Sequence, residues 1–216
     1  MDNYLLVKIL MLPGVIIAIT FHEFAHAYAA DKLGDYTPRS QGRLNLNPLT
    51  HIDPIGFILL LLAGFGWGKP VQINPRNFDN KVSLRTGEAI VSFAGPLMNF
   101  ILAIIFMILT VAIQFFAPDT TLFNVLYSIC SFSCVINIGL GIFNLIPLPP
   151  LDGSKILKNF LPYNAVNWFE NNERIFYIIF LVIWITGISS FILTPIFNAV
   201  YSGLNWLVLN IFELFL

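Results

Sequence analysis

Long apolar runs, separated by two polar stretches, organise this chain. The first run, from about Tyr4 to Ala30, predicts a helix long enough to cross a hydrocarbon core of about 30 Å. A polar insertion occupies residues 31–54, and a second polar stretch occupies residues 67–85. Between them, residues 55–66 are apolar but too few to span a membrane, so they predict a short or re-entrant helix.

The second half of the chain contains three further apolar regions. Residues 87–117 and 122–146 each predict a membrane-spanning helix. The second of these ends at the Pro147–Pro150 segment, because proline lacks a backbone donor and its ring clashes with the preceding turn. Residues 175–216 are long enough for two helices, and we expect the interruption near Thr194–Pro195.

The polar insertion contains an alternating pattern. From Gln41 to Asn47, polar and apolar residues alternate with period two, which predicts a short strand or hairpin. Taken together, the pattern predicts an all-α polytopic membrane protein that forms a single domain over residues 1–216. We expect about five to six transmembrane or partial helices, with a short β-hairpin after the first helix.

Composition supports the membrane assignment. The 216 residues are 57% hydrophobic and 11% charged, whereas soluble domains carry about 25% charged residues. The lipid bilayer is therefore an expected partner. The net charge of −1 gives no indication of nucleic-acid binding, and no cleavable signal peptide is expected, because the first apolar run lacks a small-residue cleavage site.

The basic residues predict a topology. Of the eleven Lys and Arg residues, seven lie between residues 32 and 85 and three lie between residues 155 and 174. If residues 55–66 do not cross, both basic stretches lie on one side, which the positive-inside rule makes cytoplasmic. The amino terminus is then outside.

His22, Glu23 and His26 are the first candidates for chemistry. On a helix, two histidines four residues apart project from one face, so both imidazoles can reach one metal ion. Glu23 is beside them, where a carboxylate can take a proton from a metal-bound water. Ionisable side chains in an apolar helix are expensive in lipid, which favours a functional interpretation over packing.

A catalytic zinc site commonly has a third protein ligand, and Asp152 is a candidate for it. By the predicted topology, Asp152 approaches the membrane from the same cytoplasmic half as the two histidines. The prolines before it restrict the backbone and Gly153 permits a tight turn, so the carboxylate could point into the bundle. Taken alone, the dipeptide is well explained by an ordinary Asp-Gly turn at the membrane surface.

Three motifs together resemble a known family. They are His22-Glu23-x-x-His26, Gly95-Pro96-x-x-Asn99, and Asn144-x-x-Pro147-x-Pro149-x-Leu151-Asp152-Gly153. This set, which covers about residues 15–160, resembles the site-2 protease family of intramembrane zinc metalloproteases.

The resemblance has specific implications. It implies one catalytic Zn²⁺ held by His22, His26 and Asp152, with Glu23 as the catalytic base and membrane-spanning segments of other proteins as substrates. It also implies a membrane-associated β-hairpin, for which Arg39 to Asn47 fits, that presents an extended substrate strand. The size of the chain and the resemblance together predict a prokaryotic plasma membrane protein.

Other polar residues in the apolar helices have less specific interpretations. Small and polar residues recur at helical spacing on one face, which is typical of helix packing; they are Cys130, Cys134, Asn137, Gly141 and Asn144. We expect Asn144 to line the site and bind the substrate backbone, and Asn99 either to do the same or to bind another helix. His51, in a polar loop, is not included among the ligands.

Three alternatives to this interpretation exist. The third ligand could be a downstream glutamate, Glu170 or Glu173, in a different membrane zinc protease. The chain could instead be a divalent-metal transporter, although it lacks the internal repeat typical of transporters. It could also be an inactive scaffold, which the complete set of ligands and base disfavours. The sequence specifies neither a substrate nor an oligomeric state.

Overall fold

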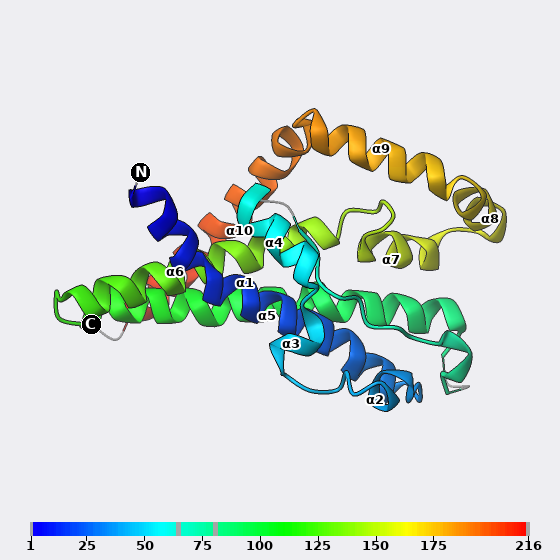
Figure 1. Cartoon of the computed structure of the whole chain (residues 1–216), viewed down its shortest axis with the longest axis horizontal. Helices are drawn as coiled ribbons and strands as arrows, with labels where there is room; N and C mark the ends of the chain where they lie inside the picture. Colours follow the sequence, from blue (N-terminus) through cyan, green and yellow to red (C-terminus); the bar gives the residue numbers. More distant parts are fainter. Residues whose placement is uncertain (1, 64–65, 80–81, 215–216) are drawn as a thin grey trace.

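The computed structural model describes residues 2–63, 66–79 and 82–214, and within these ranges the regular structure is helical (Figure 1). Side-chain caps begin several helices: Ser83 accepts a hydrogen bond from the Thr86 amide, and Asn47 accepts one from the Leu49 amide. The elements are α1 (Asp2–Lys32), α2 (Thr37–Ser40), α3 (Pro48–His51), α4 (Pro54–Ala63), η1 (Pro75–Asn77), α5 (Leu84–Phe116), α6 (Thr121–Asn144), α7 (Asp152–Phe160), α8 (Tyr163–Asn171), α9 (Glu173–Ile185) and α10 (Ile188–Glu213).

Four of the described helices, α1, α5, α6 and α10, are long and apolar enough to cross a membrane. With 10 residues, α4 is too short for a crossing, and α9, with 13 residues, is also short of the roughly 20 that a span requires. The predicted all-helical, multi-pass architecture is therefore present, with four candidate spans among the described helices.

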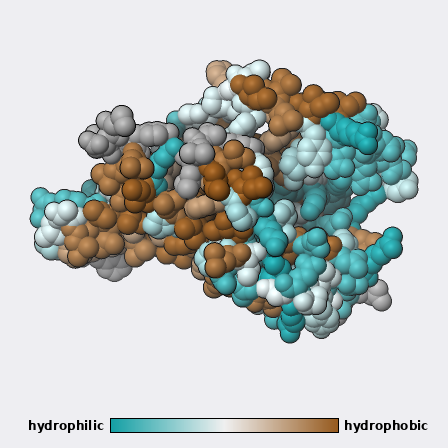
Figure 2. Space-filling view, in the orientation of Figure 1, coloured by the Kyte–Doolittle hydropathy of each residue, from teal (hydrophilic) through white to brown (hydrophobic). Residues whose placement is uncertain are grey.

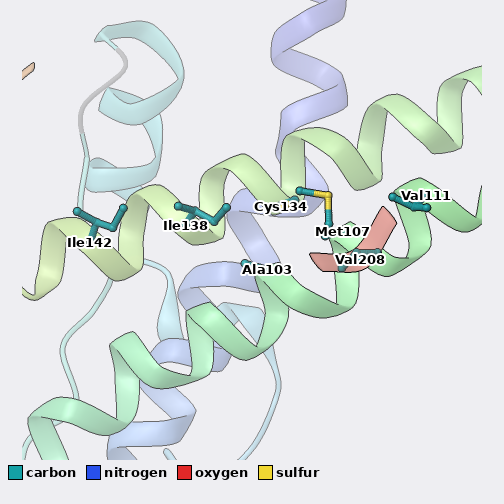
Figure 3. Packing of buried hydrophobic residues seen from close by; sticks show 7 residues of the cluster. All are labelled: Ala103, Met107, Val111, Cys134, Ile138, Ile142 and Val208. Carbon is teal, nitrogen blue, oxygen red and sulfur yellow. The ribbon is translucent and has the colours of Figure 1, made fainter. Parts of the chain in front are cut away.

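The core lies between α5 and α6, which run side by side, while α1 crosses them and α10 packs against both (Figure 1). Figure 3 shows side chains from α5, α6 and α10 meeting in this core; they are Ala103, Met107, Val111, Cys134, Ile138, Ile142 and Val208. Cys134 is 1% exposed within this cluster, and both cysteines are free thiols. A packing role for Cys134 follows.

Polar and apolar surfaces separate along the long axis of the molecule (Figure 2). Hydrophilic residues gather at the right-hand end, over α2, α7 and α8, and hydrophobic residues cover the α5–α6 region beside it. The polar insertion and the segment after α6 therefore lie at the same end of the bundle, as the distribution of basic residues predicts.

The predicted β-hairpin over Arg39–Asn47 is wrong, because the described insertion contains α2, a turn and α3 in its place. Gly42, with φ of 66°, turns the chain. The Asn45 side chain accepts a hydrogen bond from the Asn47 amide at 2.7 Å, and the Asn47 side chain caps α3. The alternating polar residues thus bond to nearby backbone groups and do not mark the solvent face of a strand.

The predicted break near Thr194–Pro195 is also displaced. The chain breaks at Gly187, whose φ is 74°, while Pro195 lies inside α10. A glycine in the left-handed conformation is a common helix terminator, and prolines are tolerated within membrane helices. The glycine, and not the proline, therefore separates α9 from α10.

Candidate active site

Two helices bring three predicted ligands together. His22 and His26 are one turn apart on α1, and their Nε2 atoms are 3.0 Å from each other. Asp152, the first residue of α7, places Oδ2 3.2 Å from both of these nitrogens. Both histidines are buried and Asp152 is half-buried. A carboxylate and two imidazoles thus converge on one point.

Hydrogen bonds to the far sides of the rings fix the tautomers of both histidines. His26 Nδ1 is 2.7 Å from the Val91 carbonyl oxygen. A carbonyl can only accept, so this Nδ1 carries a hydrogen, and Nε2 is the nitrogen left for a metal ion. Asn99 Nδ2 donates to the Ala18 carbonyl at 3.2 Å, which turns its Oδ1 toward His22 Nδ1 at 2.7 Å. His22 therefore also has Nε2 as the nitrogen left for a metal ion.

This donor set fits a zinc ion. Two imidazole lone pairs and a carboxylate oxygen are all acceptors, so at these separations they repel one another unless a cation or proton lies between them. Zinc bonds of about 2.0–2.2 Å in a tetrahedral site place neighbouring ligand atoms roughly 3.3–3.5 Å apart, close to the separations seen here. Hydrogen bonds from the far ring nitrogen to groups such as the Asn99 side chain and the Val91 carbonyl are typical of metal-binding histidines.

Two glycines, Gly95 and Gly153, allow the close helix contacts on which this geometry depends. A Cβ atom on Gly95 of α5 would lie 2.5 Å from His26 Nε2 and 2.6 Å from His22 Cε1. A Cβ on Gly153 would collide with the carbonyl oxygens of Leu145 and Ile146 at the end of α6. Glycine at these positions lets α5 pass directly against the Nε2 and Cε1 edges of the imidazoles, and lets α7 begin against the end of α6.

Glu23 is held by a loop and not by another helix. Residues 67–73, which we call the strap, run from α4 toward η1 as neither helix nor strand (Figure 1). The Val71 amide in the strap donates to Glu23 Oε2 at 2.9 Å. One carboxylate oxygen of Glu23 is thereby fixed, and the described structure gives Oε1 no hydrogen-bond partner.

Of the two expectations for Asn99, the structure supports the contact with another helix. Asn99 is 0% exposed, and it bonds to His22, to the Ala18 carbonyl and to Asn137 Oδ1, the last at 3.0 Å. Its polar atoms are therefore occupied by ligand support and interhelical contacts. Asn144, the other expected substrate contact, is half-buried, and its Nδ2 donates to Leu140 O within its own helix.

Asn137 is a site residue that the sequence assigned only to packing. It accepts from Asn99 and donates to the Ser133 carbonyl, so it links α6 to the support of His22. The signal in the sequence that could have identified Asn137 is its position as an asparagine among the small residues on one face of α6.

The two downstream glutamates lie outside the ligand cluster. Glu170 forms a salt bridge with Lys158 at 3.3 Å, and Glu173 begins α9. Across the ranges that the structure describes, His22, His26 and Asp152 are the one group of three such side chains whose ligand atoms all lie within 4.8 Å of one another. Neither glutamate therefore fits as the third ligand.

Known proteins resemble this chain, one of them over nearly its whole length. The family model described as peptidase family M50 matches residues 112–187. A Bacillus subtilis protein named "Putative zinc metalloprotease YwhC" is 38% identical over 99% of both chains. The Methanocaldococcus jannaschii "Putative zinc metalloprotease MJ0611" is 32% identical over 83% of this chain and 84% of its own. The Mycolicibacterium smegmatis "Putative zinc metalloprotease Rip2" is 33% identical over 72% of this chain and 59% of its own. No solved structure matches the chain.

Proposed function

Because the chain belongs to peptidase family M50 and is a zinc metalloprotease, we propose that it hydrolyses peptide bonds in or near transmembrane segments of other membrane proteins. The observation that carries this proposal is the convergence of His22, His26 and Asp152 at the end of the candidate span α1. Membership in a peptidase family also argues against the two alternatives of a divalent-metal transporter and an inactive scaffold.

Each residue of the site has a role in this proposal. Held by His22, His26 and Asp152, one zinc ion would supply a Lewis acid that polarises the scissile carbonyl and acidifies water. Glu23 accepts a proton from the attacking water on Oε1 and later delivers it to the leaving amine. The Val71 amide keeps Oε2 engaged, so that Glu23 presents one oxygen to the reaction.

An apolar cavity supports the proposal that the substrate is embedded in the membrane. It has a volume of about 410 Å³ and lies between α4, α6, α9 and α10. Its wall includes Leu60, Phe143 and Phe197, and it reaches Gly66 beside the start of the strap. A transmembrane helix has its amides bonded internally, so the substrate must unwind before a carbonyl can reach the metal centre. Substrates with helix-weakening residues are therefore expected to be cleaved best.

The strap, and not residues 39–47, offers an edge for an unwound substrate. The inward groups of Lys69 and Val71 are bonded to the protein. On the other edge, the described structure gives no hydrogen bond to the backbone of Gln72, whose side chain is exposed. An extended peptide could add to this edge by main-chain hydrogen bonds.

For localisation, we propose a prokaryotic plasma membrane with the active site facing the cytoplasm. The basic residues of the polar insertion and of the segment after α6 support this orientation by the positive-inside rule. The relatives named above are bacterial and archaeal proteins.

The test compares three proteins in lipid vesicles: wild type, Glu23→Gln and Asp152→Ala. Zinc content and cleavage of a model transmembrane substrate are measured on each. We expect wild type to hold about one zinc and to cut, Glu23→Gln to hold zinc without cutting, and Asp152→Ala to lose both.

Glu170→Gln serves as the matched control for a carboxylate outside the site, and it should behave as wild type. Undiminished cleavage by Glu23→Gln, or zinc retained in Asp152→Ala, would contradict the proposed roles. Cleavage confined to a soluble linker of the substrate would contradict the membrane-embedded substrate.

A further inference from the structure

Arg43 is a buried cation that has no role in the metal site described above. Its side chain belongs to the polar insertion and is 6% exposed. Among the described residues it forms no salt bridge, and its buried Nε has no hydrogen-bond partner. Burying an unpaired charge is costly unless the position serves a purpose.

The contact that Arg43 makes is with the strap. Arg43 Nη2 donates to the Lys69 carbonyl oxygen. On the same residue, the Lys69 amide donates to the His51 carbonyl at 2.8 Å. Both backbone groups of Lys69 are therefore held by the polar insertion, one by the guanidinium and one by the end of α3.

His51 completes this anchor as a neutral side chain. It is 0% exposed, and its Nε2 donates to the Asn45 carbonyl at 2.8 Å. Burial lowers the pKa of His51, and the nearby positive charge of Arg43 lowers it further. Arg43 is thus the charged member of the anchor, and its own pKa is lowered by burial while the charge of Glu23 acts in the opposite direction.

The anchored residue is two positions before the one that holds Glu23. In an extended chain, the backbone groups of residues i and i+2 point to the same side. Lys69 and Val71 follow this rule, because the amide of Val71 reaches Glu23 Oε2 while Lys69 is bonded to His51 and Arg43. Glu23 Oε1 also lies against the strap, 3.7 Å from where a Cβ on Gly68 would be.

We propose that Arg43 is a positioning residue for Glu23, acting through the Lys69 carbonyl and the Val71 amide. The guanidinium fixes the strap, the strap fixes one carboxylate oxygen, and the other oxygen is left aimed at the reaction. This inference rests on the proposed function, in which Glu23 is the general base. Displacing a catalytic group by about 1 Å can cost about a hundredfold in rate, so a support of this kind has a measurable effect.

The experiment uses the full chain in lipid vesicles, as wild type, Arg43→Gln, Arg43→Lys, Arg39→Gln and Glu23→Gln. Arg39 is the matched control: it lies in the same insertion, but its side chain is 60% exposed and pairs with Asp31. Three quantities are measured: zinc per chain, kcat and KM for a model transmembrane substrate, and hydrogen exchange of the amides in the strap.

For Arg43→Gln we expect zinc content as in wild type, KM within about twofold, and kcat lower by about ten- to a hundredfold. Exchange at the Lys69 and Val71 amides should rise. Arg43→Lys should recover part of kcat, because an ammonium can still donate one hydrogen bond to the Lys69 carbonyl. Arg39→Gln should match wild type in all three measurements.

Two different results separate failure of the inference from failure of the proposed function. If Glu23→Gln is inactive with zinc bound while Arg43→Gln keeps wild-type kcat or wild-type strap exchange, only the inference is overturned. Loss of zinc in both Arg43 variants would also overturn it, since Arg43 would then support the fold and not Glu23. If Glu23→Gln cleaves as wild type, the proposed function fails and the inference fails with it.

Discussion

The two halves of the active site are supported by different kinds of structure. The ligand half depends on packed helices: α5 provides Val91 and Asn99 behind the two histidines, and α6 provides Asn137 behind Asn99. The base half depends on the strap, a segment that is neither helix nor strand and is bonded to the polar insertion. Zinc binding and turnover should therefore respond to different substitutions.

The largest effect is expected in the ligand half, from Gly95→Ala. The added Cβ would lie 2.5 Å from His26 Nε2, so α5 must move away or the imidazole must rotate out of place. We expect zinc affinity to fall by about a hundredfold or more and stability by about 1–3 kcal/mol. Zinc titration and thermal unfolding measure both quantities.

The matched control for Gly95→Ala is Gly203→Ala in α10, where an added Cβ meets no atom within 4 Å. It should leave zinc affinity unchanged. Wild-type affinity in Gly95→Ala would show that the close passage of α5 against the histidine rings is not needed.

A smaller effect on the same half is expected from Asn99→Ala. His22 would lose the partner that orients its ring, and loss of such a hydrogen bond behind a metal ligand costs about 10–100-fold in metal affinity. Asn210→Ala is the control, because the Asn210 side chain donates only to the carbonyl of Trp206 in its own helix. If both variants bind zinc equally well, Asn99 does not support the site.

The smallest effect on zinc binding is expected at the far end of the strap, from Asp35→Asn. Asp35 is 0% exposed and accepts hydrogen bonds from Thr37, Asn77 and the Asn74 amide. Its replacement should cost about 1–3 kcal/mol of stability at neutral pH. Zinc content should not change, because these contacts belong to the base half. Asp119→Asn, in the exposed connection between α5 and α6, is the control.

The effect of Asp35→Asn should depend on pH. Burial opposes ionisation of Asp35, but the hydrogen bonds from Thr37, Asn74 and Asn77 outweigh it and lower the pKa of Asp35. A lowered folded pKa stabilises the protein above the unfolded pKa of about 3.9, and this contribution is lost as the pH falls toward the folded value. The difference in unfolding temperature between wild type and Asp35→Asn should therefore shrink between pH 6 and pH 3. A constant difference would argue against this account.

The features that depend only on neighbouring residues, such as the long helices and the histidine pair, could be predicted from the sequence. Apolar runs predicted α5 and α6, and the i, i+4 spacing placed His22 and His26 on one face. The alternation at residues 41–47 misled, because seven residues of period two are compatible with either a strand or a series of asparagine turns. Nothing in that stretch distinguishes the two.

Contacts between segments that are distant in the sequence could not be predicted in the same way. The bond between Asn99 and His22 depends on how α5 passes α1, and the contact of Arg43 with Lys69 depends on the path of the strap. Arg43 had no signal in the sequence, since an arginine in a polar insertion is ordinarily solvated. Residue type and spacing indicate a zinc ligand set, but the support of each ligand comes from tertiary packing.

X-ray absorption at the zinc edge of the wild-type protein would test the ligand half most directly. The chain has three histidines, so the number of imidazoles around the metal distinguishes the alternatives. We expect two imidazole nitrogens, with the remaining neighbours oxygen atoms from Asp152 and water. A third imidazole, which His51 alone could supply, or a sulfur neighbour from Cys130 or Cys134 would contradict it.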